Sequence, residues 1–340
     1  MMARIATALA ALAATLLAAA EPVMAKPELL IDADSGRVLF AQDATLPWYP
    51  ASLTKLMTTY VILNAVRQGR IKLTTPIVYS ARAAEEKPSK WGLKVGTVAT
   101  VDNVLKMMLV KSANDLAVML AEGLDGSVEN FVAEMNATAQ RLGMTQSHFV
   151  NPNGWWEPDH VSSARDMAIV ADALVREFPQ SLPMFDIRAV QLGDKITRGH
   201  NRILGLFPGA EGMKTGFTCP SGFNLVALAS RGNRRLIAVL MGYDNDRSRT
   251  EAAAKLLTEG FGTITFWRVG APVQALAPVA AEPPNLRDEV CHKRPQQEAE
   301  DTGDATPLSG LVDTDAGQPY LAKSAPPIVP VRVFLGTTPP

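Results

Sequence analysis

The chain carries almost no excess charge of either sign, and this argues against one class of function. Its 340 residues include 33 Lys and Arg against 34 Asp and Glu, a formal net charge of -1. Proteins that bind the nucleic-acid backbone usually present a basic patch or stripe. No basic stripe with interleaved aromatic residues stands out in this sequence. We therefore expect no nucleic-acid partner.

Long hydrophobic runs are absent except at the N-terminus. Arg4 precedes an apolar run of 16 residues, 5–20, which is short for a membrane-spanning helix. Small residues near Ala25 fit a signal-peptide cleavage site, so we expect residues 1–25 to be removed and the mature chain to begin at Lys26. The alternative is an N-terminal membrane anchor. No later segment approaches 18 apolar residues, so the mature protein is expected to be soluble or peripheral.

Histidine and cysteine are scarce. The four histidines are scattered, without a His-Glu-x-x-His pattern or a close His/Asp cluster, which disfavours a zinc peptidase. The two cysteines, Cys219 and Cys291, are too few for a disulfide framework. An exported protein could oxidise them. Because Cys291 lies in a charged, Pro-rich stretch, we expect a free thiol at Cys219 rather than a disulfide.

The order of secondary structure places strands at both ends of the chain with helices between them. Short apolar runs flanking turn residues predict strands, and apolar residues at helical spacing predict helices. The helix predicted over 101–119 is broken around 111–115. This order favours α and β layers with an antiparallel sheet assembled from both termini. The predicted strands are 29–31, 37–40, 223–228 and 235–241, and the predicted helices are 52–66, 101–119, 127–142, 164–177 and 250–259.

A change in composition marks the end of the main domain near residue 269. Half of the 24 prolines fall between 270 and 340, in a stretch that lacks apolar periodicity. We interpret 26–269 as one domain and 270–340 as a mostly disordered tail. Only 328–335 is strand-like within that tail. The alternative is a small β domain.

Three short motifs occur in a fixed order and are the strongest functional signal. They are Ser52-Leu-Thr-Lys55, Ser112-Ala-Asn114 and Lys214-Thr-Gly216. Ser and Lys three positions apart share one face of a helix, so the amine can take the proton of the hydroxyl without a histidine. Each motif alone has an ordinary explanation: a helix cap, a solvated lysine or a turn. All three together indicate a serine nucleophile activated by lysine.

The motifs and their surroundings resemble the D-alanyl-D-alanine carboxypeptidases, low-molecular-mass penicillin-binding proteins of the bacterial cell envelope. The likeness runs from about residue 27 to 269. It implies a fold of the serine β-lactamase/D,D-transpeptidase type, an α+β architecture in which helices flank a five-stranded antiparallel sheet beside a helical subdomain. The matching stretches are PASLTKLMT (50–58), SAND (112–115), NR (201–202) with GMKTGFT (212–218), MN (135–136) with LGM (142–144), and HVSSARDM (160–167).

The resemblance assigns the catalytic roles to residues of all three motifs. Ser52 would be the nucleophile and Lys55 its general base. Ser112 would relay a proton, and Asn114 would orient the substrate backbone. Lys214 would assist proton transfer and keep positive charge in the site.

The resemblance also implies substrate-binding residues. Thr215 would hydrogen-bond the substrate carboxylate, and Gly216 would allow a close approach of the ligand or the Ser52 helix. The backbone N–H groups of Ser52 and Phe217 would form the oxyanion hole. Arg249 matches the family arginine that binds the terminal carboxylate, and its alternative role is a surface charge at a helix start. Phe217 stands where members often have a polar residue.

The activity implied is removal of the terminal D-Ala from peptidoglycan stem pentapeptides by an exported, penicillin-sensitive enzyme. No metal or organic cofactor is implied, β-lactams are expected inhibitors, and the location is the periplasm or cell envelope. A peripheral membrane association stays open, although the tail carries no amphipathic basic helix. The alternatives are a D,D-endopeptidase, a serine β-lactamase and a catalytically silent envelope-binding module. Glu157 lies in the region of a deacylating glutamate, but its context does not match.

Overall fold

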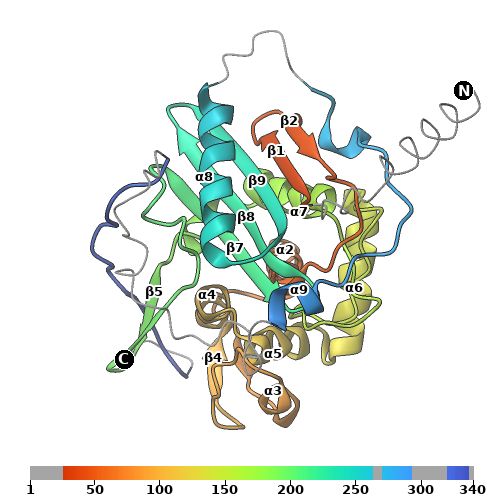
Figure 1. Cartoon of the computed structure of the whole chain (residues 1–340). Helices are drawn as coiled ribbons and strands as arrows, with labels where there is room; N and C mark the ends of the chain where they lie inside the picture. The colour runs from red at the N-terminus through yellow and green to blue at the C-terminus, as the bar shows by residue number, and fades with distance from the viewer. Residues whose placement is uncertain (1–25, 263–269, 293–319, 337–340) are drawn as a thin grey trace, which may run out of the picture.

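The computed structural model describes residues 26–262, 270–292 and 320–336 (Figure 1). The predicted signal segment, 1–25, and residues 293–319 of the predicted tail lie outside the described residues. Among the helices of the described ranges, none has the length and apolar character needed to cross a lipid bilayer.

A five-stranded antiparallel sheet forms the centre of the molecule and confirms the fold class. Its strand order is β2-β1-β9-β8-β7, so the first two strands join the last three and the sheet is assembled from both ends of the domain. β7 therefore occupies one edge of the sheet. The strands are β1 (Glu28–Asp32), β2 (Arg37–Gln42), β7 (Ala210–Thr218), β8 (Gly222–Arg231) and β9 (Arg234–Tyr243).

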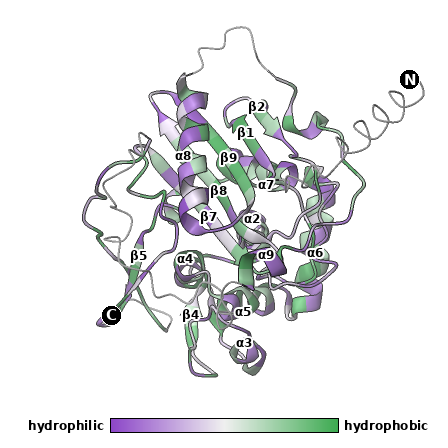
Figure 2. Ribbon diagram, viewed as in Figure 1, coloured by the Kyte–Doolittle hydropathy of each residue, from purple (hydrophilic) through white to green (hydrophobic). Residues whose placement is uncertain are grey.

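The central strands carry apolar side chains on both faces of the sheet, and both faces are buried. Successive side chains of a strand point to opposite faces. On β8, Leu225 and Ala227 pack in the cluster that includes α8 (Asp246–Gly262), whereas Val226 and Leu228 join the core on the other face. α8 crosses the front of the sheet in Figure 1, and α7 (Ala164–Glu177) lies behind it. The central strands are green in Figure 2, and α8 shows purple on its outer side.

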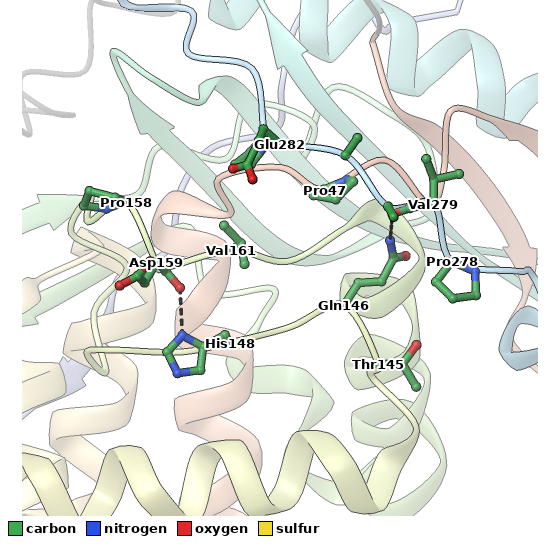
Figure 3. Close-up of a pocket in the computed structure, with 13 residues that line it drawn as sticks. Pro47, Thr145, Gln146, His148, Pro158, Asp159, Val161, Pro278, Val279 and Glu282 are labelled. Carbon is green, nitrogen blue, oxygen red and sulfur yellow. Dashed lines mark hydrogen bonds between the residues drawn. The ribbon is translucent and has the colours of Figure 1, made fainter.

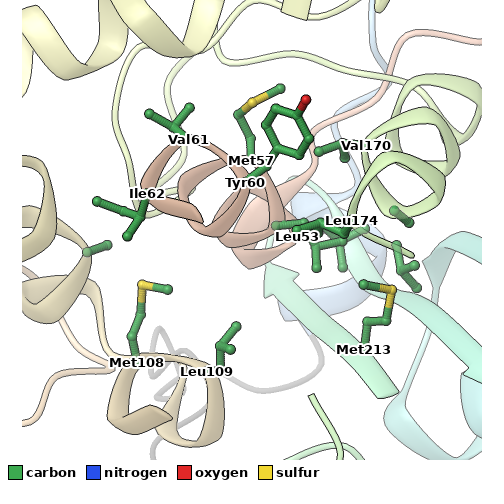
Figure 4. Close-up of a cluster of buried hydrophobic side chains, with 14 of the residues drawn as sticks. Leu53, Met57, Tyr60, Val61, Ile62, Met108, Leu109, Val170, Leu174 and Met213 are labelled. Atoms are coloured by element: carbon green, nitrogen blue, oxygen red, sulfur yellow. The ribbon is translucent and has the colours of Figure 1, made fainter. Parts of the chain in front are cut away.

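α2 (Thr54–Arg67) is buried on nearly all sides and lies between the sheet and the other helices. The short 3₁₀ turn η1 (Ala51–Leu53) precedes it and continues into the same helical direction. Burial of large apolar side chains contributes about 1.5–3 kcal/mol each, so this helix is firmly placed. Figure 4 shows its own apolar side chains, with that of Leu53 in η1, packed among those of neighbouring elements. The residues of α2 and η1 are Leu53, Met57, Tyr60, Val61 and Ile62, and the neighbours are Met108, Leu109, Val170, Leu174 and Met213.

A helical subdomain packs beside the sheet, as predicted. α4 (Val101–Lys111) and α5 (Asn114–Asp125) are separated by a break at the predicted position, where Ser112 adopts φ +60°. Side-chain caps define the starts of three helices here: Ser80 caps α3 (Ala81–Glu85), Thr100 caps α4 and Ser127 caps α6 (Val128–Leu142).

Two small sheets and several short elements were not predicted. β3 (Pro76–Val78) pairs with β4 (Val98–Thr100), and β5 (Ala189–Leu192) pairs with β6 (Lys195–Arg198). Strands of three or four residues carry too few alternating positions to stand out in a sequence. The predicted helix at 250–259 is longer than expected, since α8 begins at Asp246. The 3₁₀ turn η2 (Pro179–Met184) follows α7.

The prediction of a mostly disordered tail is wrong for the parts of the tail that are described. β10 (Val331–Val333), within the stretch predicted to be strand-like, pairs in parallel with β5. Residues 270–292 lie along the domain and include η3 (Val273–Ala275) and α9 (Arg287–Cys291). Val273, Leu286 and Val290 are buried in the main core. Val273 is isolated and Leu286 and Val290 span only one helical turn, so these anchors form too short a pattern to stand out in the sequence.

The expectation of a free Cys219 thiol is also wrong, because Cys219 forms a disulfide with Cys291. The Cα atoms are 5.7 Å apart, within the usual range for a disulfide. Burial of Leu286 brings α9 back to the end of β7, and Leu286 N–H donates to Pro220 O at 3.0 Å. We refer to residues 270–292 as the strap.

The disulfide is predicted to stabilise the fold. Replacing both cysteines (Cys219→Ser with Cys291→Ser) should lower the free energy of unfolding by about 2–4 kcal/mol, because the bond constrains the unfolded chain. The bonded residues are 72 positions apart, so the constrained loop is long. Chemical denaturation of the two proteins would measure this. Equal midpoints and slopes would contradict the prediction.

Candidate active site

The first motif places a serine and a lysine in direct contact. Ser52 lies in η1 and is half-buried, and Lys55 is in the first turn of α2 with no exposed surface. The Lys55 amine donates to Ser52 Oγ at 2.8 Å, to Asn114 Oδ1 at 2.7 Å and to Asn153 O at 2.6 Å. The predicted helical spacing of Ser and Lys therefore produces the expected pair.

The break between α4 and α5 directs two polar side chains of the second motif toward different partners. Ser112 is in the left-handed conformation and Ala113 is extended, which ends one helix and starts the next. Asn114 contacts Lys55 through Oδ1 and donates from Nδ2 to Lys87 O and Pro88 O at 3.1 and 3.2 Å. Ser112 Oγ accepts a hydrogen bond from the Lys214 amine at 2.9 Å. Both helices thus contribute to one site.

The third motif lies on the edge strand β7. The Lys214 amine also donates to Thr215 O at 2.8 Å, and both side chains are buried. A Cβ atom on Gly216 would lie 2.9 Å from Pro50 O and 3.1 Å from the backbone nitrogens of Ser52 and Leu53. Glycine is therefore needed at this position for β7 to contact the turn that carries the nucleophile.

The structure thus brings Ser52, Lys55, Ser112, Asn114, Lys214 and Gly216 together at one place, where η1, the α4–α5 break and β7 meet. Two serine–lysine pairs result, Ser52 with Lys55 and Ser112 with Lys214. Each hydroxyl has an amine within hydrogen-bond distance, which is the geometry required for proton transfer.

Arg249 does not touch that cluster directly. Arg249 lies near the start of α8, is buried, and donates to Asn224 O of β8 at 3.0 Å. It also pairs with Asp246, which in turn pairs with Arg202. Asn224 is the β8 partner of Gly216. The ring of Phe217 stacks on Phe223 with centroids 4.2 Å apart, and the Arg249 guanidinium lies 5.8 Å from the Phe223 centroid. The predicted surface-charge alternative is therefore excluded.

The loop 151–160 contributes residues that sequence reasoning did not assign. Asn153 O accepts from Lys55, and a Cβ on Gly154 would lie 1.9 Å from Ala51 O. The Asn-Pro-Asn-Gly run at 151–154 signals a tight turn. That signal could have located the loop, but not its contact with Lys55. Trp156 packs edge-on against Tyr49 with ring centroids 6.0 Å apart.

His160 holds the same loop against the start of α2. Its Nδ1 accepts from Val150 N–H at 3.3 Å, so Nε2 carries the proton and donates to Thr54 Oγ1 at 2.8 Å. Burial, with smaller contributions from His148 and Lys55, lowers the pKa of His160 to about 3. The imidazole is therefore neutral, and His160 adds no positive charge near Lys55.

A separate groove of about 600 Å³ lies between the strap and the segment 145–161 that follows α6 (Figure 3). This segment folds back on itself as a hairpin, in which His148 pairs with Val161. Gln146 Nε2 donates to Val279 O at 3.1 Å across it, and His148 bonds to Asp159 O at 2.8 Å. No residue that lines this groove belongs to the Ser52 cluster. In the described ranges, no group of three or more His, Cys, Asp or Glu could hold a metal ion.

A family model described as D-alanyl-D-alanine carboxypeptidase matches residues 14–245, which is more than half of the sequence. The chain belongs to this family. It is 36% identical over 243 residues to the D-alanyl-D-alanine carboxypeptidase DacF of Bacillus subtilis, a match that covers 70% of this chain and 62% of that protein. The chain thus spans less than two thirds of that relative's length.

Solved structures of penicillin-binding proteins have the same fold. Penicillin-binding protein 5 from Haemophilus influenzae matches with a TM-score of 0.67 and 35% identity, covering 72% of each chain. Penicillin-binding protein D2 from Listeria monocytogenes, in its cefotaxime-bound form, matches with a TM-score of 0.63 and 28% identity. That match covers 70% of this chain and 97% of the other. The strap lies beyond the residues that the family model matches.

The lowered pKa of His160 predicts a pH dependence of stability. The unfolded chain, with a histidine pKa near 6.5, binds a proton that the folded chain excludes down to about pH 3. Stability is therefore fully present above pH 6.5 and falls as the pH drops below it. Between pH 7.5 and 5.5 the wild-type protein should lose about 1.4 kcal/mol more than His160→Gln.

Denaturant unfolding at the two pH values would measure this difference. His148→Gln, which changes an exposed histidine of the same hairpin, is the matched control. A loss in His160→Gln equal to that of the wild type would contradict the neutral, buried imidazole.

Proposed function

We propose that the protein is an exported serine D,D-carboxypeptidase that removes the terminal D-Ala from peptidoglycan stem pentapeptides. The observation that carries the proposal is the 2.8 Å contact between the Lys55 amine and Ser52 Oγ, inside a site that also holds the Ser112–Lys214 pair. Membership of the family supports the same reading.

Acylation begins at Ser52. Its Oγ attacks the carbonyl between the two D-alanines as Lys55, in its neutral form, takes the hydroxyl proton. The oxygen that becomes negative would be stabilised by the backbone N–H groups of Ser52 and Phe217, and the missing side chain at Gly216 lets β7 approach the turn that carries Ser52.

Departure of the terminal D-Ala needs a proton on its nitrogen. Ser112 Oγ supplies this proton and regains one from the Lys214 amine, to which it is hydrogen-bonded. Water then hydrolyses the ester on Ser52 and releases the shortened peptide. No step requires a metal ion or an organic cofactor.

Recognition of a free carboxylate separates a carboxypeptidase from an endopeptidase. Lys214 and Thr215 lie on β7 beside the nucleophile, and Arg249, near the start of α8, adds a buried guanidinium that donates to Asn224 O of the neighbouring strand β8. Arg249 Nε is buried and has no hydrogen-bond partner in the described part of the chain. A carboxylate that reaches this end of the cleft therefore meets positive charge, which favours a terminal D-Ala over a cross-linked one.

The outer edge of β7 offers a place for the peptide backbone. An extended peptide can add to an exposed sheet edge through main-chain hydrogen bonds. Among the strands of the described residues, β7 is the last of its sheet and pairs with β8 alone. The stem peptide would lie along this edge with its carboxylate near Lys214. β-Lactams would occupy the same place as inhibitors; the Listeria relative has been solved in a cefotaxime-bound form.

Export to the periplasm or cell envelope is part of the proposal. Its support is the N-terminal pattern of one cation, an apolar run and small residues before Lys26. A disulfide in the mature domain fits an oxidising compartment. A peripheral association with the membrane is compatible with this location.

The test is mass spectrometry of the mature protein with diacetyl-L-Lys-D-Ala-D-Ala and, separately, with benzylpenicillin. We expect release of one D-Ala per peptide and a penicilloyl adduct on the tryptic peptide that contains Ser52. Ser52→Ala should abolish both, since it removes the attacking oxygen. Adduct formation without peptide cleavage would favour an endopeptidase or a binding role, and no adduct at all would contradict the proposal.

A further inference from the structure

Hydrolysis of the ester on Ser52 requires a group that takes a proton from water. Two carboxylates from the segments around Asn114 are candidates, Asp115 and Glu86. Asp115 accepts hydrogen bonds from Tyr79 Oη and from the backbone N–H groups of Trp91, Gly92 and Leu116, at 2.8–2.9 Å. Both of its oxygens are therefore occupied in fixing the loop that follows residue 89.

Glu86 is differently placed, between the two loops that hold Lys55 and Asn114. Its Oε2 accepts a hydrogen bond from Asn153 Nδ2 at 2.9 Å. The carbonyl oxygen of Asn153 accepts from the Lys55 amine at 2.6 Å. A single residue therefore separates the Glu86 carboxyl from the amine that contacts the nucleophile.

Hydrogen bonds to the two residues that follow Glu86 also hold it in place. Residues 87 and 88 provide the carbonyl oxygens that accept from Asn114 Nδ2. Asn153 is almost fully buried, and its Oδ1 accepts from Trp155 N–H at 2.7 Å, so its amide nitrogen is directed at Glu86. The carboxyl is half-buried and keeps some access to solvent.

The surroundings of Glu86 favour proton exchange. Burial raises the pKa of Glu86 and the nearby Asp115 raises it further, while the Asn153 hydrogen bond, Arg82 and Lys55 act in the opposite direction. A raised pKa makes a carboxylate a better base than an ordinary surface glutamate. Carboxyls with raised pKa values beside reactive groups are often functional, and here the raised pKa of Glu86 accompanies a defined hydrogen bond to Asn153.

We propose that Glu86 is the general base of deacylation, a role that rests on the proposed acyl-enzyme. The Glu86 carboxylate takes a proton from a water molecule as the water oxygen attacks the ester carbonyl on Ser52. The bond from that carbon to Ser52 Oγ then breaks, and the Lys55 ammonium returns a proton to Oγ. Lys55 is then neutral again, as acylation requires, Glu86 loses its proton to solvent, and the Lys214 amine regains the one that it gave to Ser112 during acylation. The products are the free acid and the intact serine.

The same step would set how long a β-lactam adduct persists on Ser52. A penicilloyl group on Ser52 is also an ester, and water activated by Glu86 would release it as penicilloic acid. Class A β-lactamases also use a glutamate and a water for deacylation. The glutamate considered from the sequence, Glu157, is exposed, whereas Glu86 is half-buried and contacts Asn153 from 67 positions earlier in the chain.

The experiment compares wild type with Glu86→Gln, which keeps an oxygen for the Asn153 hydrogen bond and removes the base. The full mature chain is acylated with benzylpenicillin, excess ligand is removed, and loss of the adduct is followed by mass spectrometry. We expect a similar acylation rate and about 100-fold slower loss of the adduct, as removal of a general base predicts. Glu85→Gln, an exposed neighbour with the same charge change, should behave like the wild type.

A pH profile adds a readout that a purely structural role would not produce. The wild-type deacylation rate should fall on the acid side as Glu86 protonates, and this limb should be absent in Glu86→Gln. A rate of adduct loss in Glu86→Gln within about three-fold of the wild-type rate would overturn the proposal. So would an equal slowing of acylation and deacylation, which indicates a displaced Asn153 loop. A wild-type protein that forms no adduct would overturn the proposed function itself and this proposal with it.

Discussion

The three hydrogen bonds of the Lys55 amine are the interaction on which the rest of the site depends. They join Ser52 in η1, Asn114 at the start of α5 and Asn153 in the 151–160 loop, at 2.6–2.8 Å. A fully buried amine is costly unless its donors are satisfied, so these three segments must stay together for the fold to accommodate Lys55. The same requirement keeps the amine beside the serine hydroxyl.

The fold supplies what those contacts need. α2 is held from all sides by apolar packing, and β7 reaches η1 only because position 216 has no side chain. His160 stays neutral and anchors the loop that carries Asn153. Stability and function therefore use the same residues: the segments that fix Lys55 also surround Ser52.

Much of this arrangement could be predicted from the sequence, because it depends on local spacing. The Ser52–Lys55 pair follows from one helical turn, and the break at Ser112 from interrupted periodicity. Contacts between distant loops could not be predicted: Asn153 with Lys55, Glu86 with Asn153, and the disulfide that the strap forms at Cys219. The strap is held by a few buried residues separated by polar ones, so its sequence is similar to that of a disordered tail.

The central claim is that Lys55 activates Ser52, and the rate of acylation tests it most directly. The second-order rate constant for benzylpenicillin should be compared between wild type and Lys55→Gln, with circular dichroism to verify the fold. The account predicts a fall of about 100-fold or more, because a general base contributes 10²–10⁴ in rate. Acylation of a folded Lys55→Gln protein within ten-fold of the wild type would contradict it.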